Sequence, residues 1–238
     1  MPIGDSADVD VRGLRILNLA KIDGLPVHPS LAHRQAILVD WFRRQGARVE
    51  EIELPGLKHS FEIWAAMMGE AGGEPFRVMM GQGHAVSPAK ELLKWSVGQS
   101  KHTAMASLLG LSESVIELLP GRAVKMKNLG LELREELANR LGDDGILFMP
   151  PYTEPAPRHN VPFLKQLGLR FNYAYTAILN VLQLPATQVP LGMDRLRLPL
   201  GVQVVARHGQ DHLSIATAEL IEEVFGGWEP PAIAGLNI

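Results

Sequence analysis

The sequence predicts an α/β fold in which helices cover the faces of a β-sheet. Residues 14–20 alternate apolar and polar side chains as a half-buried strand does, a helical pattern follows over 29–46, and 49–54 form a second strand. A strand, a helix and a strand joined by short connections are typical of the parallel crossover unit. The continuous apolar run 146–149 is typical of a strand that is buried on both faces. These observations together favour a sheet with helices packed on it.

The first helix has a clear apolar face and clear ends. Its side chains Leu31, Leu38 and Phe42 recur at helical spacing, Pro29 favours a start, and Gly46 favours a stop. Further helices are predicted over 59–68 and 121–141. The region 88–119 is predicted to be helical, with no order of helices assigned. Proline residues from 150 onward end the buried strand and predict an extended loop over 152–162.

The last third of the chain is predicted to return to the sheet. A helix over 171–182 precedes a strand at 187–189, and a hairpin-like excursion over 192–199 leads into a strand at 202–206.

The final helix is expected to begin with Asp211 as its N-cap. Leu213, Leu220 and Val224 are expected to share its buried face, and Gly226 with Gly227 to end it. With no internal repeat or linker in the pattern, we expect a single α/β domain over 1–238.

Composition excludes several classes of protein. The 238 residues carry a net charge of −3, with 46% hydrophobic and 21% charged residues, which argues against disorder. The absence of cysteine excludes disulfides, Cys-ligated metals and thiol catalysis. No basic run suggests a nucleic-acid partner, no apolar run reaches the ~18 residues of a membrane span, and no signal peptide is visible. We therefore expect a cytoplasmic protein.

Local motifs for catalysis or cofactor binding do not appear in the chain. The phosphate-binding glycine motifs, HExxH and GxSxG are all absent. His208 and His212 are four residues apart, but Gly209 lies between them, and solvated histidines are favoured over a metal site. We therefore expect no cofactor and no metal, and the motifs alone leave the activity open.

Two stretches near the C-terminus are far more specific. Residues 184–192 (LPATQVPLG) and 198–231 (LPLGVQVVARHGQDHLSIATAELIEEVFGGWEPP) resemble the end of the amidase signature family. There, a Leu-Pro-X-Gly-X-Gln strand precedes a helix that begins near Asp-His-Leu. Residues 141–162 resemble the strand and proline-rich loop upstream in that family, while 47–68 and 84–98 are similar to its fatty-acid amide hydrolase branch, second form. The resemblance covers about 14–231 and implies a mixed β-sheet flanked by helices, as in the C-terminal half of that fold.

The resemblance does not extend to the family's catalytic residues. Its members share a Gly/Ser-rich stretch with a nucleophilic Ser and a bridging Ser, a Lys upstream, and an oxyanion hole of backbone N–H groups. No such stretch occurs here and no two serines are adjacent; Ser112 and Ser114 flank Glu113. The chain therefore resembles the C-terminal portion of such an enzyme without its Ser-Ser-Lys triad, and no catalytic residue is carried over.

The resemblance implies that this portion helps to line an acyl pocket, through the stretches 67–95, 151–159 and 171–180. The substrate-pocket candidates are Tyr152, Asn172, Tyr173, Tyr175, Thr176, Asn180 and Gln203. Amidotransferase relatives that use glutamine have an acidic residue shortly before the motif that matches Thr176 and Asn180, and this chain has none there. The ammonium of glutamine would therefore have no partner, and a substrate with an apolar acyl group is expected instead.

Several candidates also have structural explanations. Tyr173 and Tyr175 fit the core as well as they fit a pocket, and Gln203 is favoured as a partner of loop backbone over a substrate contact. The four methionines in 67–80 suit an alkyl tunnel, although a helix interface is favoured for them.

Two functions follow from the resemblance. In the first, the chain is a truncated or separately encoded part of a hydrolase that cleaves carboxylic amides, including fatty-acid amides. It would then meet its small-molecule amide only together with a complementary catalytic half. In the second, it is a non-catalytic remnant or a binding and interaction module. Either way, we expect apolar surface uncovered by the missing half to cause self-association or binding of an N-terminal half.

Overall fold

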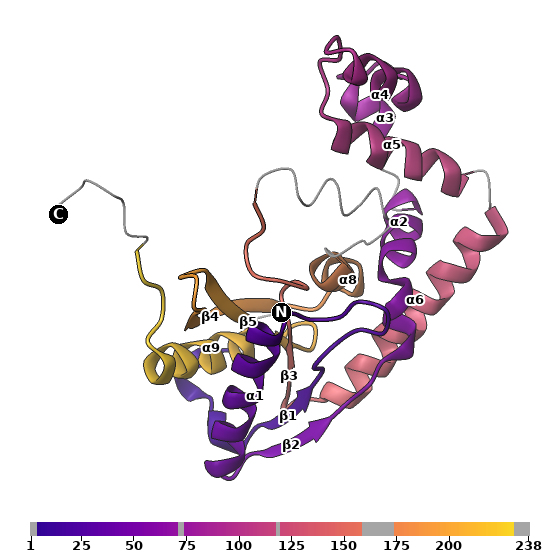
Figure 1. The fold of residues 1–238 in the computed structure, drawn as a ribbon. Coiled ribbons are helices and arrows are strands. Elements are labelled where there is room, and N and C mark those ends of the chain that lie inside the picture. The colour runs from indigo at the N-terminus through magenta and orange to yellow at the C-terminus, as the bar shows by residue number, and fades with distance from the viewer. Residues whose placement is uncertain (1–3, 71–73, 118–119, 159–173, 231–238) are drawn as a thin grey trace. The chain divides into compact units, whose positions relative to one another are not determined.

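The computed structural model describes residues 4–70, 74–117, 120–158 and 174–230 (Figure 1). The chain divides into two compact units. Unit 1 comprises Met1–Pro55, Leu137–Ala156 and Leu184–Ile238, and unit 2 comprises Gly56–Glu136 and Pro157–Gln183. Single-domain organisation of residues 1–238 stays a prediction.

Unit 1 contains a five-stranded mixed sheet in the order β2-β1-β3-β5-β4. Its strands are β1 Arg15–Asn18, β2 Arg48–Glu51, β3 Gly145–Met149, β4 Ala186–Met193 and β5 Pro199–Ala206. Strand β1 is parallel to β2 and to β3, whereas β5 is antiparallel to both β3 and β4. The mixed sheet, the parallel crossover and the C-terminal hairpin are thereby confirmed. Strand β4 is longer than predicted and includes Pro190, which an edge strand tolerates because its missing N–H deprives no neighbouring strand of a partner.

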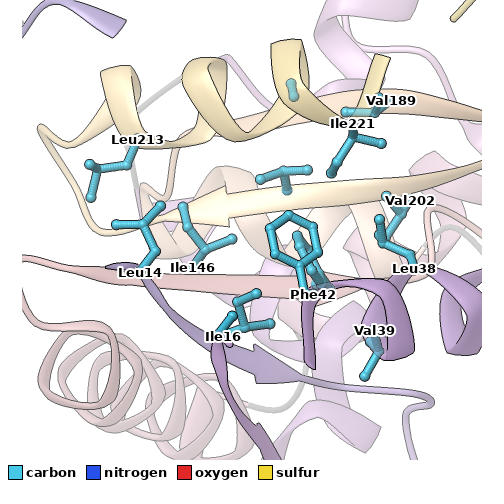
Figure 2. Packing of buried hydrophobic residues seen from close by; sticks show 14 of the residues in the cluster. Leu14, Ile16, Leu38, Val39, Phe42, Ile146, Val189, Val202, Leu213 and Ile221 are labelled. Atoms are coloured by element: carbon cyan, nitrogen blue, oxygen red, sulfur yellow. The ribbon is translucent and has the colours of Figure 1, made fainter. Parts of the chain in front are cut away.

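Helices α1 (Pro29–Arg44) and α9 (Asp211–Phe225) pack on the sheet of unit 1. Figure 2 shows Leu38 and Phe42 of α1 and Ile221 of α9 with the apolar side chains of the strands. The ring centroids of Phe42 and Phe148 lie 5.4 Å apart. All five residues of β3 are buried, which confirms the prediction for the run 146–149. Hydrophobic burial on this central strand therefore stabilises unit 1.

Helix α9 ends at Gly226 as predicted, but it differs from its prediction at the N-cap and on its buried face. Gln210 occupies the N-cap, and Asp211 is the first helical residue. The negative charge of Asp211 interacts favourably there with the positive end of the helix dipole. Val224 is 40% exposed, whereas Ile221 is fully buried and takes the place on the inner face that was expected for Val224. Gly226 ends the helix with φ of 94°, the left-handed conformation that glycine adopts most readily.

Gly201, in the Leu-Pro-X-Gly-X-Gln motif, lies where β5 approaches β4 closely. A Cβ atom at this position would be 2.3 Å from Nε2 of Gln188 and 2.7 Å from the carbonyl oxygen of Val189. The first contact is with a flexible side chain, but the second is with the backbone of the paired strand. The motif therefore needs glycine here because any side chain would push the two strands apart.

We expect Gly201→Ala to lower the free energy of unfolding by about 1–3 kcal/mol, the usual cost of overpacking. Adding Gln188→Ala removes only the side-chain contact, so the double variant should stay destabilised. Gly121→Ala is the control, because nothing lies within 4 Å of its Cβ position. Urea denaturation followed by circular dichroism measures all three; a wild-type midpoint for Gly201→Ala contradicts the packing argument.

Unit 2 is helical in the part that the structure describes. Its helices are α2 Ser60–Glu70, α3 Phe76–Met80, α4 Pro88–Ser96, α5 Ala104–Glu117, the greater part of α6 Pro120–Leu141, and α8 Ala174–Leu182. Short 3₁₀ turns lie in unit 1 at Ser6–Asp8 and Val11–Gly13, and at Pro55–His59 where the chain passes from unit 1 into unit 2. The helical prediction for 88–119 resolves into α4 and α5. None of the described helices has both the length and the apolarity needed to cross a membrane.

Helices α2 and α6 approach closely at Gly130. A Cβ atom there would be 2.7 Å from Cγ2 of Ile63 and 2.6 Å from Sδ of Met67, so the absence of a side chain admits both. Met67 thus fills a helix interface, as the sequence favoured, while Met68 and Met79 are 50% and 59% exposed.

Glu91 links α4 to the segment that precedes α5. Its carboxylate accepts hydrogen bonds from Nζ of Lys94 at 2.7 Å and from Oγ of Ser100 at 2.8 Å. Oγ of Ser100 in turn accepts the backbone N–H of His102 at 3.0 Å. The hydrogen bonds from Lys94 and Ser100 lower the pKa of Glu91 below its ordinary value of 4.5, against the opposing effect of burial.

Acid is expected to loosen this link. Because the pKa of Glu91 is lower in the folded chain than in the unfolded one, its stabilising contribution is complete above the unfolded pKa. The contribution is lost as the pH falls through the folded pKa. Hydrogen-exchange protection factors of α4 and α5 should fall between pH 5 and pH 3, and fall less in Glu91→Gln, with the exposed Glu135→Gln as control. Equal pH dependence in the wild type and Glu91→Gln would show that this carboxylate does not control the link.

Candidate functional site

The predicted pocket residues are distributed over both units. Tyr152 and Gln203 belong to unit 1, and Tyr175, Thr176 and Asn180 belong to unit 2. Asn172 and Tyr173 lie outside the described residues. The pocket role of all seven stays a prediction.

Helix α8 presents two of the candidates to solvent and buries a third. Thr176 and Asn180 are its two exposed residues, and a spacing of four places them on one face of the helix. The other seven residues are buried, and Tyr175 is fully so. The burial of Tyr175 fits the core alternative, whereas the pair Thr176 and Asn180 forms a polar stripe on an otherwise apolar helix.

The C-terminal end of α8 is held by Arg134 of α6. Nη2 of Arg134 donates a hydrogen bond to the carbonyl oxygen of Val181, so a cation lies at the negative end of the helix dipole. Gln183 follows the helix with φ of 57°, and its N–H donates to the carbonyl oxygen of Asn180 at 3.2 Å. Arg134 was not predicted, because no local sequence pattern connects an arginine on one helix with the end of another helix 47 residues later.

Gln203 binds the backbone that leaves β3. Its Nε2 donates to the carbonyl oxygen of Pro150 at 3.1 Å, and the residue is only 6% exposed. Tyr152 is half-buried two residues further along the same loop. The bond to Pro150 is the structural role that the sequence favoured for Gln203.

A second buried glutamine, Gln35 of α1, binds the backbone at the end of β1. Its Nε2 donates to Oδ1 of Asn18 at 2.7 Å and to the carbonyl oxygen of Leu19 at 3.1 Å. Nδ2 of Asn18 donates to Oε2 of Glu51 at 2.6 Å, which extends the network to β2. Gln35 was not predicted, although a polar residue between Leu31 and Leu38 on the apolar face was the available signal.

The loops that follow β1 and β3 are joined through their backbones. The N–H of Leu19 donates to the carbonyl oxygen of Phe148 at 2.9 Å, and the N–H of His28 donates to that of Thr153 at 2.7 Å. Both loops leave the carboxyl ends of parallel strands, which is the edge where open α/β sheets bind ligands.

Three serine hydroxyls in the described part of unit 2 bind nearby backbone. Oγ of Ser60, Ser107 and Ser114 each donates to a backbone carbonyl three or four residues earlier. Within the described part of the chain, no group of three His, Cys, Asp or Glu residues is placed to hold a metal ion.

A hollow of about 330 Å³ lies in unit 1, and none of the predicted pocket residues lines it. It is lined by Gly4, Asp5, Asp8, Val9, Asp10, Leu14, Asp143, Asp144, His212 and Leu213. Asp143 forms an ion pair with Arg207 at 3.0 Å, and both Asp143 and Asp144 precede β3. The hollow therefore lies toward the amino end of β3, opposite the edge where the two glutamines hold the loops.

Comparison with known proteins places the chain in a family. The Amidase family model matches residues 9–215. The chain is 40% identical to fatty-acid amide hydrolase 2-A of Danio rerio over 94% of this chain and 43% of that relative. It is 41% identical to human fatty-acid amide hydrolase 2 over 78% of this chain and 35% of that relative. Identity to a glutamyl-tRNA(Gln) amidotransferase subunit of Methylorubrum extorquens is 23%, over 95% of this chain and 48% of that relative. The chain thus spans less than half the length of these curated relatives.

Solved structures show the same fold. The corresponding glutamyl-tRNA(Gln) amidotransferase subunit of Thermotoga maritima aligns with a TM-score of 0.63 at 21% identity, over 90% of this chain and 43% of that one. A fatty acid amide hydrolase structure aligns with a TM-score of 0.60 at 16% identity, over 95% of this chain and 42% of that one. With the family model matched along most of its length, the chain belongs to the amidase signature family, as the motifs in 184–192 and 198–231 predicted.

Proposed function

We propose that this chain is the C-terminal portion of an amidase signature hydrolase that cleaves carboxylic amides, fatty-acid amides among them. The observation that carries the proposal is the level of identity: 40–41% to fatty-acid amide hydrolase 2 from two vertebrates, against 23% to the amidotransferase subunit. The chain by itself lacks the Ser-Ser-Lys triad, and it acts on an amide only together with the catalytic portion. The proposed location is the cytoplasm.

The residues around α8 support an apolar acyl group. No acidic side chain occurs from 171 to 180, so the ammonium of glutamine would have no partner there. Helix α8 is predominantly apolar, with Thr176 and Asn180 as its exposed polar residues. A pocket of this kind gains free energy by burying hydrocarbon, at about 25 cal/mol per Å².

Complementation tests the proposal. The chain is co-expressed with the part of the Danio rerio relative that the match leaves uncovered, and hydrolysis of oleamide is followed by ammonia release. Turnover that needs both parts supports the proposal, and co-purification of the two identifies the partner. If a folded complex forms without turnover, the alternative of a non-catalytic binding or interaction module is favoured. Sedimentation of the chain alone measures its oligomeric state, and so distinguishes binding to the catalytic portion from self-association.

Acyl preference is a prediction for the complemented enzyme. We expect decanamide to be hydrolysed with a kcat/KM at least about 100-fold above that of glutamine, because a stranded ammonium costs several kcal/mol whereas a methylene changes binding by ~1–3 kcal/mol. Chain-length preference should accordingly be broad.

Tyr173→Asp should shift the ratio toward glutamine, with Leu196→Asp, at a side chain that is 79% exposed, as the control for a charge elsewhere. A preference for glutamine in the unmodified complex would show that 171–180 do not line the acyl pocket.

A further inference from the structure

The sheet of unit 1 ends in two strands of different character. Its order β2-β1-β3-β5-β4 gives β2 and β4 one neighbouring strand each among the described residues (Figure 1). The backbone N–H and C=O groups on the outer side of such a strand can pair with a further strand. Proteins commonly prevent this pairing with charged side chains, prolines or bulges on the edge strand. The residues of the two strands therefore indicate which edge can accept a further strand.

Strand β2 is protected by charge. Three of its four residues, Arg48, Glu50 and Glu51, are charged and exposed. Glu51 forms an ion pair with Arg43 at 2.5 Å, and Glu50 forms one with Arg140 at 4.0 Å. A strand added beside β2 would remove water from these charges, so this edge is unfavourable for pairing.

Strand β4 carries no charge on any of its eight residues, Ala186–Met193. Its second part is protected in another way, because Pro190 lacks an N–H and the register shifts between Pro190 and Met193. Its first part, residues 186–189, contains neither a charge nor a proline, and Ala186 and Gln188 are exposed. The first part of β4 is therefore the segment of this edge that is open to a further strand.

The register between β4 and β5 determines which backbone groups point outward. The N–H of Ala206 donates to the carbonyl oxygen of Pro185 at 3.0 Å, so these residues form a hydrogen-bonded pair. Hydrogen-bonded and non-hydrogen-bonded pairs alternate along an antiparallel ladder. Thr187 therefore bonds to β5, whereas Ala186 and Gln188 direct their N–H and C=O groups away from it. No described backbone group outside the sheet bonds to these outward groups.

We propose that a β-strand of the catalytic portion pairs with residues 186–189 of β4, a docking surface that rests on the function proposed above. This chain covers 43% of fatty-acid amide hydrolase 2-A of Danio rerio, so more than half of that enzyme lies outside the match and can supply the strand. Backbone hydrogen bonds to Ala186 and Gln188 provide affinity without requiring particular side chains. Because the edge carries no charge, it fits a strand that is itself uncharged beside it.

Hydrogen exchange at single amides tests this pairing directly. In the isolated chain, the N–H groups of Ala186 and Gln188 are expected to exchange freely, whereas that of Thr187 is protected by β5. In the complex with the co-expressed catalytic portion, both outward amides should exchange at least about tenfold more slowly. The amides of β2 are the internal control and should keep their rates. A complex in which the amides of Ala186 and Gln188 exchange as fast as before overturns the proposal.

Charge placed at the edge tests the same surface through affinity. Ala186→Lys combined with Gln188→Lys should raise the Kd for the catalytic portion at least about tenfold, because the added strand would remove water from both lysines. Glu50→Lys is the matched control: it changes the net charge by the same amount on β2 and should alter the Kd by no more than about twofold. The melting temperature of the isolated double variant should stay close to that of the wild type, since both positions are exposed. Equal Kd values for the double variant and the wild type contradict the docking surface.

The outcomes separate this docking surface from the proposed function. Protection of Ala186 and Gln188 in a complex without amide turnover supports the docking surface and contradicts the hydrolase function. Turnover without that protection supports the function and overturns the docking surface. Protection that is already present in the isolated chain and fades on dilution assigns the edge to a second copy of the chain. That result, or the absence of any complex, overturns the proposal.

Discussion

The isolated chain is expected to hydrolyse oleamide and p-nitroanilides no faster than buffer does. Acyl transfer needs an activated nucleophile and donors that stabilise the oxyanion, and no Gly/Ser-rich segment that supplies them occurs in the 238 residues. In a serine hydrolase, loss of the nucleophile lowers kcat on the order of 10⁶-fold. Product release by the purified chain, measured by mass spectrometry for oleamide and by absorbance for the anilides, checks this expectation.

Contaminating hydrolases need a specific control in this measurement. Each of the ten serines is replaced by alanine in turn, and activity is followed through a second purification. Turnover that survives repurification and disappears with one serine would refute the expectation and identify a nucleophile outside the family pattern.

Phe148→Ala is expected to lower the free energy of unfolding by about 3–5 kcal/mol. Phe148 is fully buried on the central strand β3, with its ring 5.4 Å from that of Phe42. Removal of the ring leaves a cavity that the surrounding strands cannot collapse to fill. Since a domain is stable by roughly 5–15 kcal/mol, this one change removes a large part of the stability of unit 1.

Urea denaturation followed by tryptophan fluorescence measures the loss as a lower midpoint at an unchanged slope. Phe148→Leu should lose less, because much of the buried volume remains. Trp228→Ala, at a side chain that is 69% exposed, should change the stability by no more than about 0.5 kcal/mol. Equal losses for Phe148→Ala and Trp228→Ala would contradict the assignment of the core to this strand.

Periodicity and turn residues were sufficient to locate most helices and strands. The run 146–149 could be recognised as a buried strand because four successive apolar residues have no solvent face, and β3 is buried throughout. The residues that a helix buries were less predictable. The sequence pattern placed Val224 on the buried face of α9, but the packing against the sheet buries Ile221 instead. A regular helix pattern does not reveal which of two neighbouring apolar residues the tertiary fold will cover.

Polar residues that hold loops were harder to foresee. Gln203 could be predicted as a partner of loop backbone because an amide on an apolar strand must be satisfied, and it donates to Pro150. The roles of Gln35 and Arg134 could not be predicted. Gln35 donates to the carbonyl oxygen of Leu19 and Arg134 to that of Val181, and no local pattern indicates either partner. The pairing of such groups is a property of three-dimensional proximity and leaves no periodic signal.

The sequence by itself determined the family and the α/β class, because both depend on residue identity and local spacing. Only the tertiary structure decided which groups are paired and which are not. The place of β4 at the edge of the sheet, the need for glycine at 201 and the exposure of Thr176 beside a fully buried Tyr175 all arise where distant segments meet. Such contacts depend on the path of the whole chain, since the free energy of a polar or packed group is set by the neighbours that folding brings to it.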